Sequence, residues 1–346
     1  MPTRIYPYLG EANIAISAPE NLLERLERNI EERPIKGGYE GIVKVEEGEF
    51  REIKKDKTFK YASAKSNCES SLKGYDYFRY NTLVRTIWRE NDKTFHVKNH
   101  LQDDETGALK CFKNIYYSLP QSREKSLIHS SSIDLNGRGI LIVGGYRSGK
   151  TTLTFKFLEE LSAKLVEGGN TLISFKNNLK AHYLPRVLYA RLSTISSSPY
   201  LYHLIRDINC CDAQQTIDKD ALERIILSKA FHVNAELCFS REKLHELFGR
   251  NVTCSETHIN RVIFPEYSAD GPIQILDLHL DEAYNRIVDR EFPKDTSIGK
   301  LLHQTEMSPP PHSSMKKKWF ENLKFKKVVF SSWNDLTRSL LEDLLS

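Results

Sequence analysis

The chain has few residues of the kinds that stabilise secreted or membrane-spanning proteins. Only six of its 346 residues are cysteine, and no two of them form a C-x-x-C pair. It shows no signal peptide and no apolar run near the ~20 residues that cross a bilayer. We therefore expect a cytoplasmic protein with reduced thiols, no zinc site and no membrane contact. The cysteines are Cys68, Cys111, Cys210, Cys211, Cys238 and Cys254.

An excess of charge of one sign is also missing. The 50 basic and 46 acidic residues leave a net charge of +4. A protein that coats a polyanion is usually more lopsided, so the composition does not favour nucleic acid as a partner. With 40% hydrophobic and 28% charged residues the chain resembles a folded globular protein, and its length is sufficient for two domains.

Residues 1–122 are predicted to form a small mixed, mainly β module. The stretch 39–53 alternates around a central Glu-Glu-Gly turn. Two long strands are expected at 77–92 and 93–100, and a short helix near 107–119. We expect this module to help bind the substrate or another subunit.

Residues 123–300 are predicted to form an α/β nucleotide-binding domain. A β-rich segment at 127–135 and the apolar run 139–143 flank Asn136 and Gly137, which signal a tight two-residue turn. A glycine-rich loop follows this hairpin.

Apolar residues spaced four apart after that loop predict a helix from Leu153 to Val166. Gly168 and Gly169 stand where a helix end is expected. The next apolar run, 171–175, is expected to be a strand. Strand, loop, helix and strand are the elements of a βαβ unit.

The rest of the chain alternates between helical and extended patterns. Helices are expected at 187–192, 221–231, 240–249 and 281–288, and strands at 231–237, 259–267 and 272–280. The final part, 301–346, is expected to contain a linker (308–314), a basic aromatic segment (315–327), a short strand and an amphipathic helix that docks either on its own body or on another subunit.

The glycine-rich loop matches the pattern G-x-x-x-x-G-K-[ST]. The glycines allow backbone N–H groups to point at phosphate oxygens, beside the positive end of the next helix. In such loops the lysine reaches the β- and γ-phosphates, and the hydroxyl after it binds Mg²⁺. The predicted nucleotide-binding residues are Gly144, Gly145, Tyr146, Arg147, Ser148, Gly149, Lys150, Thr151 and Thr152, with Thr151 as the metal ligand.

The run IHSSSIDLNGRGILIVGGYRSGKTTLTFKFLEEL (128–161) resembles the core of the HPr kinase/phosphorylase-like family. In that family a histidine opens a strand, an Asn-Gly turn follows, and the phosphate loop comes directly after. His129, Asn136, Gly137 and Gly139 match this order. Residues 184–186 and 246–267 resemble later elements of the family more faintly.

The resemblance implies an ATP- and Mg²⁺-dependent kinase that phosphorylates a hydroxyl, often a serine, of a protein, a peptide or a small molecule. A homo-oligomer is compatible with it. Lys150 would hold the migrating phosphoryl group. His129 would orient the acceptor, with a histidine bonded only to backbone partners as the alternative.

One part of the family pattern is not found. The strand after the helix should end in an acidic pair or Asn-Asp, whose aspartate binds Mg²⁺ and accepts the acceptor's proton. We align that strand with LISFKNN (172–178), which carries no carboxylate, and the later position of a second aspartate with Asn234. The loss of a positioned base typically slows a reaction by ~100- to 10,000-fold.

Other residues near this pattern have competing roles. Asp134 stands before the Asn-Gly turn and is expected to stabilise it. Asp277 ends an apolar run, as a metal ligand would. Arg147 and Arg186 could contact the γ-phosphate or lie on the surface.

Three functions remain open from the sequence. The first is a kinase of the HPr kinase-like group. The second is a nucleotide-binding sensor or scaffold that has lost catalysis. The third, motivated by Trp319, Phe320 and Phe325 among the lysines of 315–327, is a P-loop protein acting on nucleic acid, although packing of these aromatics on the domain is the favoured interpretation.

Overall fold

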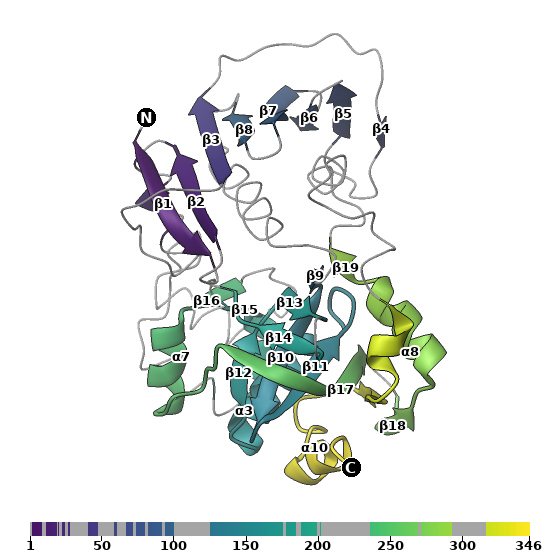
Figure 1. Ribbon diagram of the computed structural model, residues 1–346. Helices are drawn as coiled ribbons and strands as arrows, with labels where there is room; N and C mark the ends of the chain where they lie inside the picture. Colours follow the sequence, from purple (N-terminus) through teal and green to yellow (C-terminus); the bar gives the residue numbers. More distant parts are fainter. Residues whose placement is uncertain are drawn as a thin grey trace. The chain divides into compact units, whose positions relative to one another are not determined.

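The chain divides into two compact units, one formed by residues 1–123 and 293–311 and the other by residues 124–292 and 312–346. The finer boundaries expected from the sequence stay a prediction. The computed structural model in Figure 1 describes residues 2–8, 12–18, 20, 23–24, 27, 41–47, 59–60, 67–71, 74–79, 82–91, 94–99, 125–175, 178–184, 188–198, 201, 236–268, 271–292 and 316–346.

The first unit contains an eight-stranded sheet in the order β1-β2-β3-β8-β7-β6-β5-β4. The expected antiparallel pair ending at Asn91 is confirmed as β7 and β8, but the strand predicted at 77–92 is divided between β6 and β7. The helix expected near 107–119 lies outside the described residues. The strands are β1 (Thr3–Tyr8), β2 (Ala12–Ser17), β3 (Gly41–Glu47), β4 (Phe59–Lys60), β5 (Asn67–Ser71), β6 (Gly74–Arg79), β7 (Thr82–Asn91) and β8 (Thr94–Asn99).

The second unit is a mixed α/β fold around a ten-stranded sheet, which confirms the predicted fold class at this level. Its amino-terminal elements are β9 (Lys125–Ile128), β10 (Ser130–Leu135), β11 (Arg138–Val143), α3 (Lys150–Glu160), β12 (Lys164–Glu167), β13 (Thr171–Ser174), β14 (Lys180–His182), β15 (Leu188–Arg191) and α4 (Leu192–Ser197). The later elements are β16 (Glu236–Phe239), α7 (Arg241–Phe248), β17 (Glu256–Tyr267), β18 (Gln274–Asp277), α8 (Leu280–Val288), β19 (Glu291–Phe292), η1 (Lys317–Phe320), β20 (Lys324–Phe330) and α10 (Arg338–Asp343).

The strand order in the large sheet is β12-β10-β11-β17-β14-β13-β9-β19. The long strand β17 joins its two parts, because its first residues pair with β14 and the following ones pair in parallel with β11 and β20. β9 and β10 are consecutive in the chain but lie in different parts of this sheet. The break between them falls at His129.

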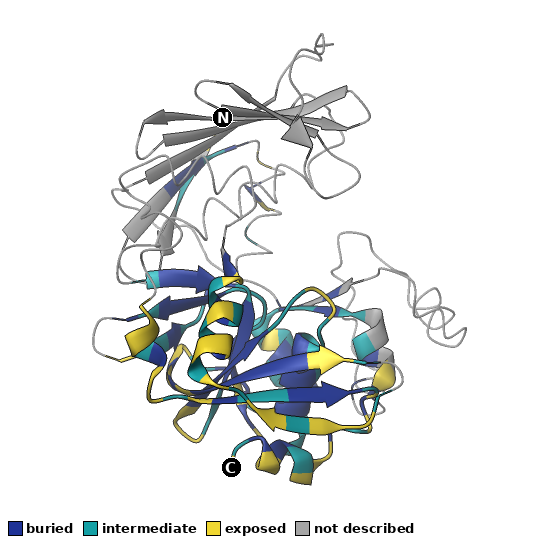
Figure 2. Ribbon diagram, turned by 90° about the vertical axis from the view of Figure 1, so that its right-hand side faces the viewer, coloured by how far each residue is buried: buried dark blue, intermediate teal, exposed yellow. Residues whose placement is uncertain are grey.

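Apolar side chains form two cores in this unit. One contains residues of α3, α7 and α10 together with Ile140, Ile142 and Phe330. The other contains residues of α8 and η1 together with Leu141, Val143 and Val262. Because side chains of a strand alternate between the two faces, β11 contributes to both cores. Figure 2 shows the central strands of this unit's sheet as buried.

The expected Asn-Gly hairpin is confirmed. β10 and β11 pair antiparallel, and Asn136 and Gly137 both have positive φ angles, of 54° and 82°. These are the dihedral angles of a turn that matches the twist of two strands. The Asp134 carboxylate accepts hydrogen bonds from Gly137 N–H and Thr257 Oγ1, so Asp134 stabilises the turn as predicted.

The helix after the glycine loop is shorter than predicted. It ends at Glu160, and Ser162 adopts a left-handed conformation with φ 55°. Arg250 donates a hydrogen bond to the carbonyl of Leu158 near this end. Residues 164–167 form β12 instead of a last helical turn, so Gly168 follows a strand. The βαβ unit is therefore completed by β12, and the expectation of a helix to Val166 is wrong.

Several later predictions are confirmed and one is wrong. α7, β17 and α8 lie where helix, strand and helix are expected, and Ser240 and Gly249 cap α7. Residues 188–191 form β15, an extended segment paired with β16, where a helix was predicted. The regions 221–231 and 308–314 lie outside the described residues.

The carboxy-terminal helix packs on its own unit. Leu336, Leu341 and Leu344 are fully buried in the core that contains α3, and Leu340 and Leu345 pack against it. Of the two open alternatives, the structure supports docking on the chain's own body.

Leu341→Ala is expected to reduce the free energy of unfolding by about 2–5 kcal/mol, because it leaves a cavity in this core. Leu340→Ala, on the half-exposed side of the same helix, is the matched control and should cost clearly less. Denaturant unfolding at two protein concentrations measures both. A cost for Leu341→Ala that depends on protein concentration would instead place the helix in a subunit interface.

Candidate nucleotide-binding site

The glycine loop connects a buried strand directly to a helix. β11 ends at Val143, residues 144–149 form the loop, and α3 begins at Lys150. Ser148 N–H donates to the carbonyl of Gly145 across the turn, at 3.3 Å. A Cβ atom on Gly144 would lie 2.3 Å from Ser148 Oγ. A larger residue at Gly144 would therefore require the Ser148 side chain to move, so glycine allows the loop to close tightly.

The second glycine of the motif, Gly149, is required by geometry. Its φ angle is +95°, and a Cβ atom there would lie 2.4 Å from Cζ of Phe330. Phe330 ends β20 and stacks edge-on with Tyr267 at the end of β17. The aromatic ring of Phe330, from the far end of the sequence, thus packs against the last residue of the loop.

Lys150 lies over the loop that precedes it. Its Nζ donates to the carbonyls of Gly144 and Gly145, at 2.9 and 2.8 Å, and the residue is 9% exposed. Burial, and secondarily the charge of Arg290, lower the pKa of Lys150 to about 8. The lysine thus lies against the loop carbonyls, and its surroundings disfavour the protonated form.

The tip of the loop presents an aromatic side chain. Tyr146 is 71% exposed, and the guanidinium groups of Arg191 and Arg147 lie 4.3 and 5.6 Å from its ring centroid. Arg147 has φ 63°. Arg191 belongs to β15, so this strand and α4 lie beside the loop. Thr152 contacts Thr194 of α4, with 3.4 Å between the hydroxyl oxygens.

His129 directly precedes β10, whose first residue, Ser130, pairs with Val143 at the end of β11. Its backbone N–H donates to the carbonyl of Arg290 at 2.7 Å. Sequence reasoning did not identify Arg290 or Arg191, because both lie far along the chain from the motif.

A carboxylate does end the strand after the P-loop helix. That strand is β12, and its last residue is Glu167, 4% exposed. Its carboxylate oxygens accept hydrogen bonds from the N–H groups of Gly168 and Leu184, at 2.7 and 3.1 Å. The first strand after α3 is therefore β12, and the segment 172–178 belongs to the next strand, β13, and the residues that follow it. The sequence signal for β12 is weak and consists of an apolar pair, Leu165 and Val166, that is followed by Gly168 and Gly169.

The position of Glu167 follows from the sheet register. Ser132 of β10 pairs with Leu141 on one side and with Glu167 on the other. β11 and β12 run in the same direction on the two sides of β10, so their carboxyl ends reach the same edge of the sheet. The glycine loop and Glu167 share that edge.

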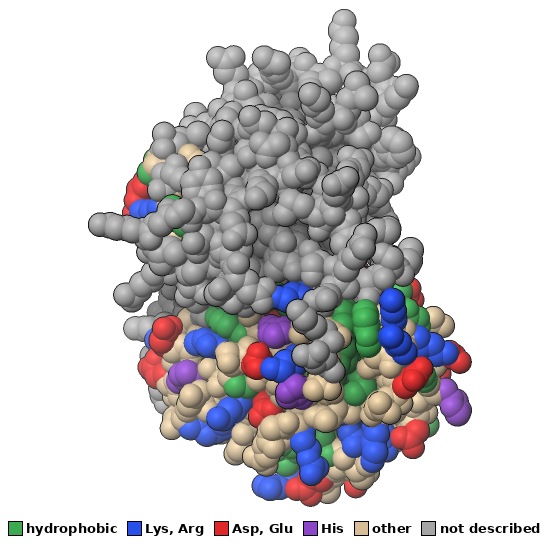
Figure 3. All heavy atoms as spheres, viewed as in Figure 1, with side chains coloured by type: hydrophobic (Ala, Val, Ile, Leu, Met, Phe, Trp, Pro, Cys, Tyr) green, Lys and Arg blue, Asp and Glu red, His purple; other side chains and the backbone are tan. Residues whose placement is uncertain are grey.

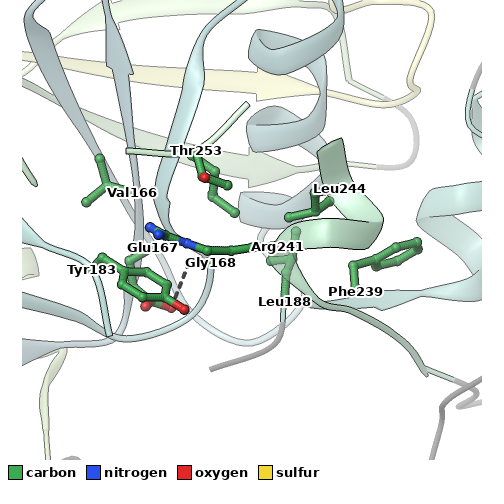
Figure 4. Close-up of a pocket in the computed structure, with 10 residues that line it drawn as sticks. Val166, Glu167, Gly168, Tyr183, Leu188, Phe239, Arg241, Leu244 and Thr253 are labelled. Atoms are coloured by element: carbon green, nitrogen blue, oxygen red, sulfur yellow. Dashed lines mark hydrogen bonds between the residues drawn. The ribbon is translucent and has the colours of Figure 1, made fainter. Parts of the chain in front are cut away.

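A pocket lies beside Glu167 (Figure 4). Arg241 extends across it toward Tyr183, and its guanidinium lies 3.5 Å from the centroid of that ring. Arg241 also donates to the carbonyl of Cys254. Leu188 and Phe239 form an apolar wall. The pocket is lined by a carboxylate (Glu167), a guanidinium (Arg241) and apolar side chains.

The segment 172–178 has a different environment. Ser174 and His182 are hydrogen-bonded across β13 and β14, at 2.8 Å, and Glu256 lies 3.6 Å from the other ring nitrogen of His182. Lys176, Asn177, Arg186 and Asn234 lie outside the described residues.

Asp277 does not lie in a ligand cluster. It is 83% exposed and forms an ion pair with Lys326 of β20, at 3.0 Å. Across the described ranges, no group of three or more histidine, cysteine or acidic residues could hold a metal ion. Cys254 is a free thiol, and burial raises its pKa to about 11.

The aromatic residues of the basic segment face the protein. Trp319 stacks on Phe175 with ring centroids 4.3 Å apart, and Phe320 and Phe325 are buried. Figure 3 shows basic and acidic side chains interspersed over the visible face of this unit. In the parts of the chain described, no helix is long and apolar enough to span a bilayer.

No protein-family model matches the chain, and no curated protein matches it either. Among solved structures, the chain is similar to the Hpr(Ser) kinase/phosphatase from Coxiella burnetii. The two share 11% identity, the match covers 63% of this chain and 94% of that one, and the TM-score is 0.29. A TM-score this low carries no argument about function.

Gly149→Ala is expected to destabilise the protein by about 2–4 kcal/mol, because it combines a left-handed backbone with a clash against Phe330. Gly249→Ala is the matched control: its φ angle is +61°, but nothing lies within 4 Å of the added atom. Thermal unfolding of both variants measures the difference. Equal losses would contradict the support of the loop by Phe330.

Proposed function

We propose that the chain binds a nucleoside triphosphate with Mg²⁺ at residues 144–152 and transfers its terminal phosphoryl group to an acceptor hydroxyl. ATP is the nucleotide that the resemblance implies, and a serine of a protein or peptide, or a small molecule, is the acceptor class. The N-terminal module is proposed to help bind the acceptor or another subunit.

The observation that carries this proposal is the closed loop with Lys150 held over it. Loop N–H groups and the amino end of α3 favour bound anions. Ser148 Oγ is buried and has no hydrogen-bond partner among the described residues, so the loop has a donor for a phosphate oxygen. These features fit a polyphosphate, and Thr151 is the residue proposed to hold Mg²⁺.

Glu167 is the carboxylate proposed to complete the site. It shares the sheet edge with the loop and stands at the end of the strand where the resemblance implies an acid. In this role it receives the proton of the acceptor hydroxyl as the bond to phosphorus forms. His129, which directly precedes β10, is proposed to orient the acceptor.

A second function is supported by the surroundings of Glu167. Both of its oxygens already accept backbone N–H groups, and the residue is almost fully buried. A carboxylate held in this way could have a structural role only. The chain would then be a nucleotide-binding sensor or scaffold without phosphoryl transfer.

Nucleotide affinity is expected to fall as the pH rises through about 8, the pKa of Lys150 in the free protein. The sign follows because only the protonated lysine attracts phosphate, so well above this pH the affinity should decrease by about tenfold per pH unit. Isothermal titration with ATP and Mg²⁺ between pH 6.5 and 9.5 measures it.

Lys150→Met is the control for this experiment. It should bind ATP much more weakly, show no such pH dependence and abolish ATP turnover. Unchanged ATP affinity and turnover in Lys150→Met would refute nucleotide binding at this loop.

Glu167→Gln separates the two candidate functions. If Glu167 is the base, the variant should bind ATP normally while phosphoryl transfer, followed with γ-labelled ATP, slows by ~100- to 10,000-fold. Glu160→Gln on α3, which removes a half-exposed partner of Lys156, is the control and should retain activity. Nucleotide binding by the wild type with no transfer to any acceptor would support the sensor instead.

A further inference from the structure

Arg290 is held in place by its backbone on two sides. Its N–H donates to the carbonyl of Ile287 at the end of α8, and its carbonyl accepts the N–H of His129. The next residue, Glu291, pairs with Ile128 in the sheet. A residue fixed by both a helix end and a strand has little freedom to move away from its position.

The side chain of Arg290 lies against the glycine loop. A Cβ atom on Gly145 would lie 3.4 Å from Nη2, 3.6 Å from Cζ and 3.7 Å from Nη1 of Arg290. Three nearly equal distances mean that the guanidinium covers Gly145 broadly. The residue is exposed, and within the described residues no side-chain hydrogen bond or ion pair involves this guanidinium.

The charge of Arg290 acts on the loop. Its guanidinium lies against Gly145, whose carbonyl accepts a hydrogen bond from Lys150 Nζ, so both cations lie at the same loop residue. Two cations over one loop repel each other, and arginine remains charged at any physiological pH. A polyanion bound at the loop would be attracted by both Lys150 and Arg290, and its charge would offset their mutual repulsion. The planar guanidinium also matches two oxygens of one phosphate group.

We infer that Arg290, in the segment that follows α8, is a second phosphate-binding residue of this site beside Lys150. This inference rests on the proposed nucleotide-binding function. It assigns to Arg290 the role that sequence patterns suggested for Arg147 and Arg186. In this proposal the Arg290 side chain contacts the phosphates beside Gly145, and Lys150 contacts them from the start of α3.

The test is isothermal titration of wild type, Arg290→Ala and Arg286→Ala with ATP and with ADP, each with Mg²⁺. Loss of a charge-assisted contact should weaken ATP binding by Arg290→Ala by about 10- to 100-fold. Arg286→Ala, one turn earlier on α8 and paired with Glu282, removes the same charge and should bind as wild type. A loss for both nucleotides assigns the β-phosphate, and a loss for ATP alone assigns the γ-phosphate.

A second readout separates phosphate contact from a structural effect. Arg290→Lys should recover part of the affinity, because it restores the charge without the planar group. Melting temperatures identify any variant that is unfolded, and Arg290→Lys then carries the test.

The outcomes distinguish the two proposals. If the wild type binds ATP and Lys150→Met does not, nucleotide binding stands whatever Arg290 does. Equal affinities of Arg290→Ala and Arg286→Ala would then overturn the role of Arg290 alone. If the wild type binds neither ATP nor ADP, both proposals fail together.

Discussion

The arrangement of the second unit depends on the double pairing of β10. This strand pairs with β11 on one side and β12 on the other, and its residues Ser130, Ser131 and Ser132 are fully buried. Because β11 and β12 then run in one direction, the segments that follow them emerge at the same edge of the sheet. The glycine loop and Glu167 share that edge, although Glu167 follows Lys150 by 17 positions in the sequence.

Positive charge is concentrated at this edge in a chain whose charges are otherwise nearly balanced. Arg147 belongs to the loop itself, and Lys150, Arg290 and Arg191 lie beside it from three other segments. Burial, and secondarily the charge of Arg290, lower the pKa of Lys150, so it costs free energy to keep this lysine protonated. The cost is offset when a polyanion binds, so the electrostatics of the fold and the proposed function point in the same direction.

The comparison of sequence and structure is most instructive at residues 161–169. Leu161 and Leu165 lie four apart, as in a helix, and Gly168 stands where a helix cap is expected. The segment 164–167 is equally compatible with a short strand, because four residues are too few for periodicity to distinguish a helix from a strand. The left-handed Ser162, which ends the helix, has no signal of its own in the sequence. Missing that break moved the search for an acid to 172–178 and hid Glu167.

The sequence alone determined the local features: the Asn-Gly hairpin, the glycine loop with its lysine, and the strong amphipathic elements such as α7, β17 and α8. These depend on backbone preferences and on contacts between near neighbours, which a short stretch of residues specifies. Only the tertiary structure decided which distant side chains join the loop. Phe330 under Gly149, Arg290 over Gly145 and Glu167 at the shared edge arise from strand order and register, and these depend on packing of the whole sheet.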